Sequence, residues 1–521
     1  MSLQGICFLS EVLIFGQDLN SISNIKSEEY SLIKKLKKGD VISTRNFGGF
    51  CPYYYRDEET GQVIVGDTAD EMIMSIPKHR RKLDPVSCLG LLNFNYPLGD
   101  RTLIQGLQRM PWHAILDASG TIERRPPIPH GHRLAEPTEI AVSLLDCLQE
   151  EISTYLDGHK CVWILLSGGL DSRITAGVVK RIQGDFTADI HAVTWGTEDS
   201  RDVAYSCQIA KHFGWEWHHL PYDETTLWEN LSIAAEWGGA EVAGVHLHAE
   251  KDLGSLVNFE DLVLASSWGD SIGRAEFSGT HILHMTIPPI VNRYWLIHRS
   301  LFAECLRLAR ADRELGWCTE PDWSRHVVTE LDSQENYMRR MISHAMNYIM
   351  RFCRLEQSFT AEKTVRTMWS YSPICRQTEV YFRLLEKLDP FLLDLPWART
   401  GVAPSGNIEK NASLKTTYHE WGRWLRQGRH EELKSLICDS GLSGLNVFNM
   451  SQVRQCFKLW REQPVDSVGL TETILQVAAI ELLRRRFELV CPGDRTNLAD
   501  ALLARAYTLG KKMYAYLPAL K

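Results

Sequence analysis

The sequence predicts an α/β fold, in which a parallel-sheet domain with a helical C-terminal part is preceded by a small β-rich domain. Three observations predict it. Beyond about residue 138, short apolar runs alternate with amphipathic stretches of helical length, which is typical of a parallel sheet covered on both faces. Beyond about residue 290, the periodicity is almost entirely helical. Before residue 125, short strand-like runs are paired around turns that contain glycine.

The chain divides at a proline-rich segment. Residues 124–132 read RRPPIPHGH, and three prolines within four positions prevent a helix or a central strand. We therefore assign residues 1–124 to the β-rich domain, 125–137 to a surface linker and 138–521 to the second domain. In the first domain, two hairpins are expected, from residues 50–55 with 62–65 and from residues 112–116 with 121–124.

The second domain begins with the alternating region. Its first strand, CVWILL, is wholly apolar, as suits a strand buried on both faces. The expected strands are residues 161–166, 190–195, 216–220 and 262–266. The expected helices of this region are residues 140–155, 173–182, 202–213, 225–237 and 244–257. Later helices are expected at residues 339–356, 379–388, 418–425 and 472–487.

Composition places the chain among ordinary globular proteins. Hydrophobic residues make up 44% and charged residues 23% of the 521 residues, which excludes a disordered or fibrous chain. The net charge of −8 argues against a nucleic-acid partner, because phosphate binding requires concentrated positive charge. No apolar run approaches the roughly 20 residues that span a bilayer, so no membrane partner is expected, and the first residues lack a signal-peptide pattern. The 13 scattered cysteines contain no C-x-x-C pair, which favours reduced thiols in the cytoplasm.

One motif in the sequence is much more specific than the others. Ser167-Gly168-Gly169-Leu170-Asp171-Ser172 follows a buried strand and opens a helix. The two glycines permit close approach of a ligand to the backbone, and the free N–H groups of the first helical turn favour an anion such as phosphate or pyrophosphate. Asp171 would repel phosphate unless a cation lay between them, so the motif also implies Mg²⁺.

This motif resembles the pyrophosphate loop (PP-loop) of N-type ATP pyrophosphatases, and its context resembles the asparagine synthetase family. Four further stretches are similar to segments of that family and occur in the same order: residues 49–67, 101–111, 194–204 and 264–270. The resemblance covers about residues 45–290 well and the helical remainder loosely. It implies an adenine-nucleotide domain preceded by a truncated, degenerate glutaminase-like domain.

The resemblance implies an AMP-forming ligase with ATP and Mg²⁺ as cofactors. ATP would adenylate a carboxylate and release pyrophosphate, and ammonia or an amine would then form the amide. The loop residues Ser167, Gly168, Gly169 and Ser172 would hold the pyrophosphate, while Asp171 and Asp270 would carry Mg²⁺. Main-chain groups near Leu165 and Val193 would meet adenine, Gly269 would contact the nucleotide, and Lys410 or Lys415 would serve as the basic residue that stabilises pyrophosphate.

The chain departs from the family at several positions. Glutamine-hydrolysing members carry a cysteine after the initiator methionine, but this chain has Ser2, and Cys7 lies internally. We therefore expect glutaminase activity to be lost. Trp268 and Ser271 replace the small or acidic residues that flank the metal-binding aspartate in amide-forming members. These replacements argue against ordinary asparagine formation.

Other clusters carry less weight. His246 and Glu250 are four residues apart and would share a helical face, but no third metal ligand accompanies them. A solvent position at a strand end is expected for His218 and His219, and a solvated helix face for residues 484–486.

Three hypotheses follow. The leading one is the ATP- and Mg²⁺-dependent ligase, acting on a small-molecule or peptide carboxylate, with other enzymes of a biosynthetic cluster as possible partners. The alternatives are a glutamine-hydrolysing asparagine synthase and a non-catalytic nucleotide-binding scaffold. The identity of both substrates and the oligomeric state stay open, because specificity depends on loops whose shape the sequence does not give.

Overall fold

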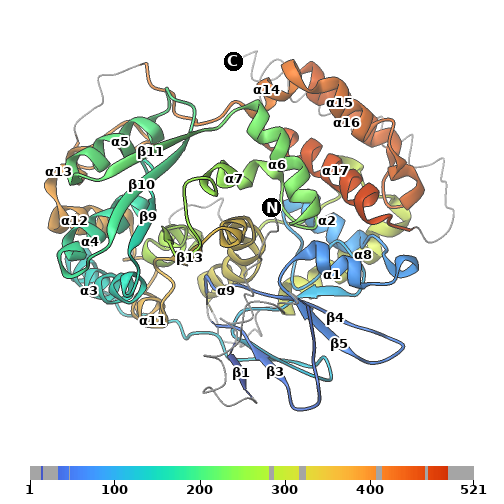
Figure 1. Ribbon diagram of the computed structural model, residues 1–521, viewed down its shortest axis with the longest axis horizontal. Coiled ribbons are helices and arrows are strands. Elements are labelled where there is room, and N and C mark those ends of the chain that lie inside the picture. Colours follow the sequence, from blue (N-terminus) through green and yellow to red (C-terminus); the bar gives the residue numbers. More distant parts are fainter. Residues whose placement is uncertain are drawn as a thin grey trace.

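The computed structural model describes residues 13–15, 33–45, 47–280, 287–315, 324–406, 413–463 and 467–490. A parallel sheet with its helices lies at one side of the molecule, a group of helices lies at the other, and antiparallel strands lie below both (Figure 1). Among the described residues, every helix is too short or too polar to cross a lipid bilayer. The ten cysteines in these ranges are all free.

The predicted parallel sheet is confirmed. Its strand order is β11-β10-β9-β12-β13, and all neighbouring pairs run parallel. The strands are β9 Cys161–Leu165, β10 Asp189–Gly196, β11 Glu216–Pro221, β12 Leu262–Ala265 and β13 Arg354–Gln357.

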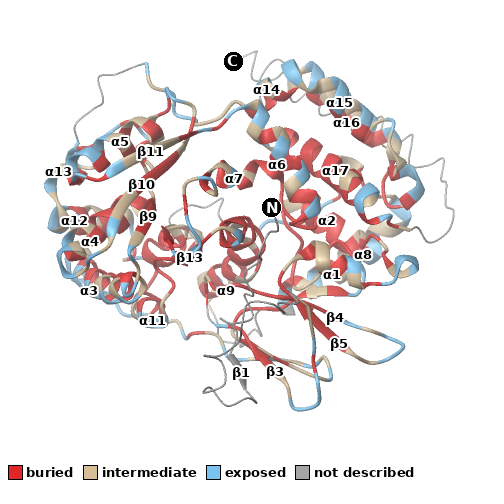
Figure 2. Ribbon diagram, viewed as in Figure 1, coloured by how far each residue is buried: buried red, intermediate tan, exposed pale blue. Residues whose placement is uncertain are grey.

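Both faces of this sheet are covered, which explains the continuous apolar runs in its strands (Figure 2). Val162 and Ile164 of β9 pack into one core with helices of one layer, whereas Trp163 packs into a second core on the other face. The first layer contains α3 Pro137–Leu156, α4 Leu170–Ile182, α5 Arg201–Phe213, α11 Glu362–Ser370 and α12 Thr378–Leu388.

Strand β13 corrects the prediction of one helix over residues 339–356. A helical run that is partly π-helical ends at Arg351, and the chain then pairs Leu355 of β13 with Val263 of β12. The pairing partner lies about 90 residues earlier in the sequence. Local periodicity carries no information about such a distant partner, so the helical pattern was extended too far.

The predicted helix over residues 244–257 is also wrong. A 3₁₀ turn, Gly244–Leu247, and a short helix, α7 Glu250–Leu253, occupy this stretch. His248 between them has φ 43°, which is incompatible with a continuous right-handed helix. His246 and Glu250 therefore do not share a helical face.

The described part of the first segment forms two antiparallel sheets, with strand orders β1-β3-β7-β8 and β2-β5-β4-β6. Both predicted hairpins are present, as β4 with β5 and as β7 with β8. The strands are β1 Leu13–Phe15, β2 Ile33–Lys35, β3 Val41–Ser43, β4 Tyr53–Arg56, β5 Val63–Gly66, β6 Leu107–Arg109, β7 Ala114–Asp117 and β8 Ile122–Arg124.

This segment also contains two helices that the sequence analysis missed, α1 Ala69–Ser75 and α2 Pro85–Phe94. Helix α2 is buried along seven of its ten residues, so it lacks the polar stripe by which an amphipathic helix is recognised. Its start is nevertheless conventional, because the Asp84 side chain accepts the N–H groups of Val86 and Ser87.

The largest core joins the first segment to the helical part. Tyr53 and Leu107 belong to the same apolar cluster as Leu475 and Phe487 of α17, which is buried along most of its length (Figure 2). The remaining longer helices are α6 Glu224–Glu236, α8 Arg299–Leu315, α9 Arg325–Asp332, α14 Trp421–Gly428, α15 His430–Ile437, α16 Met450–Glu462 and α17 Val468–Phe487. Residues 125–136 connect β8 to α3 without a strand or helix, and Ile128 of this segment is buried in the core that also contains α3.

Candidate functional site

The candidate site is a cleft at the carboxyl ends of the parallel strands. From β9 the chain continues to β10 on one side, whereas β12 lies on the other side of β9. The loops that follow β9 and β12 therefore lead in opposite directions along the sheet, which leaves a crevice at the carboxyl ends of these strands. Open α/β sheets bind their ligands in such a crevice. A cavity of about 330 Å³ is found there, lined by residues at the carboxyl ends of β9, β10 and β12, including Ser167, Trp195 and Ser266.

The glycine loop is held in place by its own hydroxyl groups. Ser172 Oγ accepts the Ser167 N–H at 3.1 Å and lies 3.0 Å from Ser167 Oγ. Ser167 Oγ also accepts the Gly169 N–H at 3.1 Å. The two serines therefore close the loop over the first turn of α4, with Ser167, Gly169 and Ser172 facing the cavity.

Gly168 is fixed from both sides by the protein. Its N–H donates to Asp202 Oδ1 of α5 at 3.0 Å, and its carbonyl accepts Arg173 Nη2 at 3.0 Å. A Cβ at this position would lie 2.7 Å from the Ala398 Cβ, so only glycine fits. Burial raises the pKa of Asp202, although the Gly168 N–H and the Arg173 charge oppose this rise.

Asp171 lies against the turn that follows β12. A Cβ on Gly269 would lie 2.2 Å from Asp171 Oδ1, and the Gly269 carbonyl accepts the Tyr381 hydroxyl at 2.8 Å. Within the described part of the chain, no hydrogen bond of ordinary geometry reaches the buried Asp171 Oδ1, although the nearby Tyr381 hydroxyl helps to lower the pKa of this carboxyl. Burial raises the pKa of Asp171, whereas the positive charge of Arg274 opposes the shift. A buried acceptor atom without an ordinary hydrogen bond suits a cation ligand.

Arg274 connects the two aspartates predicted to hold metal. Its Nη2 forms a short ion pair with Asp270, lies 3.7 Å from Asp171 Oδ2 and lies 3.0 Å from Glu276 Oε2. Asp171 and Asp270 are thus brought to one place, as predicted, but the cation between them in this structure is a guanidinium. Glu276 also pairs with Arg399 at 3.0 Å.

Aromatic side chains form another wall of the cleft. His248 stacks on Trp195 with ring centroids 5.1 Å apart and an angle of 11° between the rings. Burial, together with the charges of nearby His246 and His419, lowers the pKa of His248 to about 3, so its ring is neutral at physiological pH. His246 pairs with Glu472 of α17 at 3.4 Å. The cleft therefore offers a neutral aromatic surface beside its polar loop.

The structure brings most of the predicted site residues together. Six of them line the cleft: Leu165, Ser167, Gly169, Asp171, Ser172 and Val193. Gly168, Gly269 and Asp270 adjoin these residues but are not among the lining residues. The Val193 carbonyl accepts the Leu166 N–H at 2.9 Å, so this atom already has a partner within the sheet.

Of the two lysines predicted to stabilise pyrophosphate, Lys415 is the one that the structure describes. Lys415 pairs with Asp199 at 2.9 Å and with Glu420 at 3.4 Å, and its hydrogen bond to Asp199 raises its pKa. It is not among the residues that line the cleft. Lys410 lies outside the described residues. A role for either lysine stays a prediction.

The sequence analysis did not single out Arg274, His248 or the supporting role of Asp202. Arg274 follows Asp270 by four residues, a spacing that brings side chains together within a helical turn. That spacing could have indicated from the sequence that Arg274 lies beside Asp270. The sequence contains no comparable indication for His248, because its position depends on a positive φ and on stacking against another strand.

The fold and the cavity define an α/β domain with a cleft at the carboxyl ends of a parallel sheet, beside a loop suited to an anion. The comparison with protein families is more specific, because the asparagine synthase family model matches residues 143–243, from α3 through the glycine loop to the end of α6 and beyond. Residues 143–243 therefore match the asparagine synthase family, whose members form amide bonds with ATP. No curated protein matches the chain.

Proposed function

We propose that this protein is an AMP-forming ligase, which uses ATP and Mg²⁺ to adenylate a carboxylate and then joins it to ammonia or an amine. A carboxylate oxygen would attack the α-phosphorus of ATP and form an acyl-adenylate as pyrophosphate leaves. The ammonia or amine would then attack the acyl carbon, lose a proton and displace AMP. The observation that carries this proposal is the cleft itself, where the serine-glycine loop and Asp171 converge at the strand ends. The matched family supports the general chemistry.

The described residues suit distinct tasks in this reaction. The Ser167 and Ser172 hydroxyls and the N-terminus of α4 face the cleft and would hold the departing pyrophosphate. The Gly168 N–H is already bound to Asp202, so it would position the loop rather than bind phosphate. The Trp195 and His248 rings would supply an apolar surface for adenine.

Asp171 and Asp270 would hold the magnesium. Carboxylate oxygens are the ligands that Mg²⁺ prefers, and Asp171 Oδ1 is a buried acceptor without an ordinary hydrogen bond among the described residues. When bound, magnesium would neutralise charge on the phosphates. Arg274 lies close enough to stabilise the same negative charge, since its Nη2 contacts both aspartates.

The test is the exchange of labelled pyrophosphate into ATP, screened with pools of amino-acid, uronate and peptide carboxylates. We expect exchange with one pool, and we expect Asp171→Asn to abolish it. Asp185→Asn is the matched control, because Asp185 is an exposed acidic residue at the far end of α4. Exchange that survives in Asp171→Asn, or its absence with every pool, would overturn the proposal.

A second candidate is a non-catalytic nucleotide-binding scaffold that would act as a partner of biosynthetic enzymes. The observation that favours it is Arg274, whose positive charge already pairs with both aspartates. A scaffold would bind ATP without pyrophosphate exchange. The glutamine-hydrolysing alternative would release glutamate from glutamine. Its candidate residues, Ser2 and Cys7, lie outside the described residues.

A further inference from the structure

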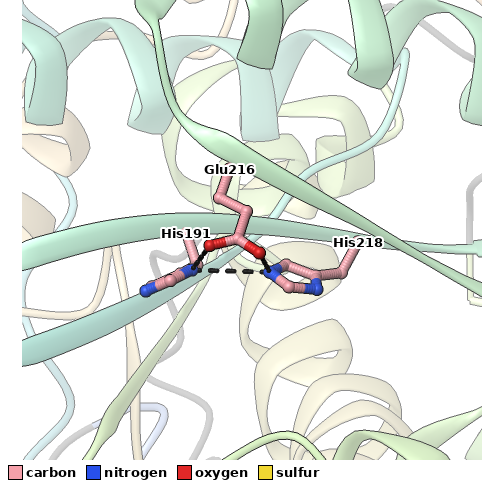
Figure 3. A group of neighbouring side chains, drawn as sticks. All are labelled: His191, Glu216 and His218. Atoms are coloured by element: carbon pink, nitrogen blue, oxygen red, sulfur yellow. Dashed lines mark hydrogen bonds and ion pairs between the residues drawn. The ribbon is translucent and has the colours of Figure 1, made fainter.

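A second group of metal-binding side chains lies near the amino ends of β10 and β11. His191 comes from β10, and Glu216 and His218 come from β11 (Figure 3). His191 Nδ1 is 3.4 Å from Glu216 Oε2, His218 Nε2 is 3.4 Å from Glu216 Oε1, and the two ring nitrogens are 3.4 Å apart. The three side chains thus point toward one another.

Strand register brings them together. His191 is the direct partner of Glu216 in the parallel pair, and Glu216 and His218 are two residues apart on one strand. All three therefore face the same side of the sheet. Trp163 of β9 lies on this side too and stacks on the His191 ring, with centroids 4.5 Å apart and an angle of 19°. The Trp163 indole N–H donates to Asp261 at 3.0 Å, which fixes the surface on which His191 rests.

The spacing is close to that around a tetrahedral ion. Ligand atoms bound to zinc at roughly 2.1 Å in tetrahedral geometry are separated by about 3.4 Å. The two ring nitrogens are 3.4 Å apart, each lies 3.4 Å from a different oxygen of Glu216, and one ligand atom from each residue lies within 4.8 Å of the other two. Two imidazole nitrogens and one carboxylate are zinc ligands, whereas Mg²⁺ and Ca²⁺ prefer oxygen alone. A tetrahedral ion with three protein ligands keeps a fourth position for water or another ligand.

Space is present beside this group. A cavity of about 590 Å³ is bordered by His191 and Glu216 and by the segments that lead into β10 and β11. The Glu216 side chain is 65% exposed, while those of His191 and His218 are 21% and 22% exposed. An ion therefore has access from this cavity to Glu216 and to the half-buried His191, while His218 lies outside its lining. From these observations we propose that His191, Glu216 and His218 form a zinc site.

This site is separate from the nucleotide cleft. Val193 lines the cleft and follows His191 by two residues, which corresponds to roughly 7 Å along a strand. His191, Glu216 and His218 are not among the residues that line the cleft. Zinc binding therefore does not depend on the proposed ligase activity, and either proposal can fail without the other.

The test measures zinc in the full-length protein after incubation with Zn²⁺ and dialysis. Glu216→Gln keeps the size of an exposed side chain but removes its charge, and we expect it to retain about one zinc less per chain than the wild type. We expect its affinity for Zn²⁺ to fall about 100-fold or more, because even the loss of an outer-shell partner costs 10–100-fold. His218→Asn should have the same effect. Thermal unfolding without metal establishes that both variants are folded.

The matched control is His212→Asn. His212 pairs with Asp389 at 2.8 Å. This pair consists of one histidine and one carboxylate, whereas the proposed site has two histidines and one carboxylate. This variant should bind zinc as the wild type does. Substitution with Co²⁺ should give the strong visible absorption of a four-coordinate ion in the wild type and not in Glu216→Gln. Zinc content that is the same in the wild type and Glu216→Gln, or a weak six-coordinate cobalt spectrum, would show that Glu216 only accepts hydrogen bonds from the two rings.

Discussion

The contact between Gly269 and Asp171 gives the sharpest test of the nucleotide cleft. In Gly269→Ala, the new methyl carbon would lie 2.2, 2.5 and 2.6 Å from the Asp171 Oδ1, Cγ and Cβ atoms. Ordinary contact begins at 3.4 Å, so the closest pair would overlap by about 1.2 Å. Because the Cβ of Asp171 is among the overlapped atoms, rotation of the carboxylate cannot relieve the overlap. The first turn of α4 or the turn after β12 must move by about 1 Å.

This displacement sets the expected magnitude. A misplacement of about 1 Å at a reacting centre costs roughly 100-fold in rate, and overpacking of a close contact costs about 1–3 kcal/mol of stability. We therefore expect Gly269→Ala to lower pyrophosphate exchange about 100-fold and to weaken the magnesium-dependent part of ATP binding. Titration with a fluorescent ATP analogue, with and without Mg²⁺, measures the second effect.

Gly184→Ala is the matched control. Gly184 follows α4, and a Cβ there would have no atom within 4 Å, so this variant should bind and exchange as the wild type does. Equal magnesium dependence in Gly269→Ala and the wild type would refute the reasoning. It would mean that Asp171 does not hold the ion, or that the two segments separate without cost.

Three further predictions follow from buried charges. Burial holds the pKa of Glu250 well above its usual value, so the folded state keeps a proton that the unfolded chain loses, and stability falls as pH rises toward the folded pKa, by up to about 1.4 kcal/mol per pH unit. Glu250→Gln should remove this loss of stability, so the difference in Tm between this variant and the wild type should widen as pH rises. Burial raises the pKa of Asp171 and Arg274 limits this rise, so Arg274→Met should shift the acidic limb of the pyrophosphate-exchange pH profile to higher pH, with Arg274→Lys nearer the wild type. Glu241→Gln should cost about 3–5 kcal/mol in urea unfolding, because it leaves the fully buried Arg340, 2.6 Å from Glu241, without its counter-charge.

The sequence was most informative where structure is local. The apolar run of β9 and the Ser167–Ser172 motif lie next to each other in the chain, so a strand, a glycine loop and a helix start could be read together. The hairpins were equally local, since each strand pair encloses a short turn. The α/β class followed from the alternation of such local units.

The features that the sequence analysis did not predict depend on contacts between distant parts of the chain. Strand β13 depends on pairing with a segment about 90 residues away. The group of His191, Glu216 and His218 depends on the register between two strands, and the sequence analysis weighed only neighbouring residues, such as His218 with His219. Helix α2 has no polar face, because it is buried inside a core shared by distant parts of the chain. In each case the deciding contact is made by residues that the local pattern does not contain.

The balance of charge around the glycine loop argues for a required cation. Asp171, Asp270 and Glu276 gather around Arg274, and Glu276 also engages Arg399. Three carboxylates therefore face two guanidinium groups, and the surplus is negative before a triphosphate enters. In a partly dehydrated cleft such a surplus repels phosphate strongly. The helix N-terminus contributes only about half a positive charge, so it does not offset both this surplus and the phosphates. In the proposed ligase, a divalent ion held by Asp171 and Asp270 would offset this surplus, and Arg274 would then be free to turn from the aspartates toward the leaving group.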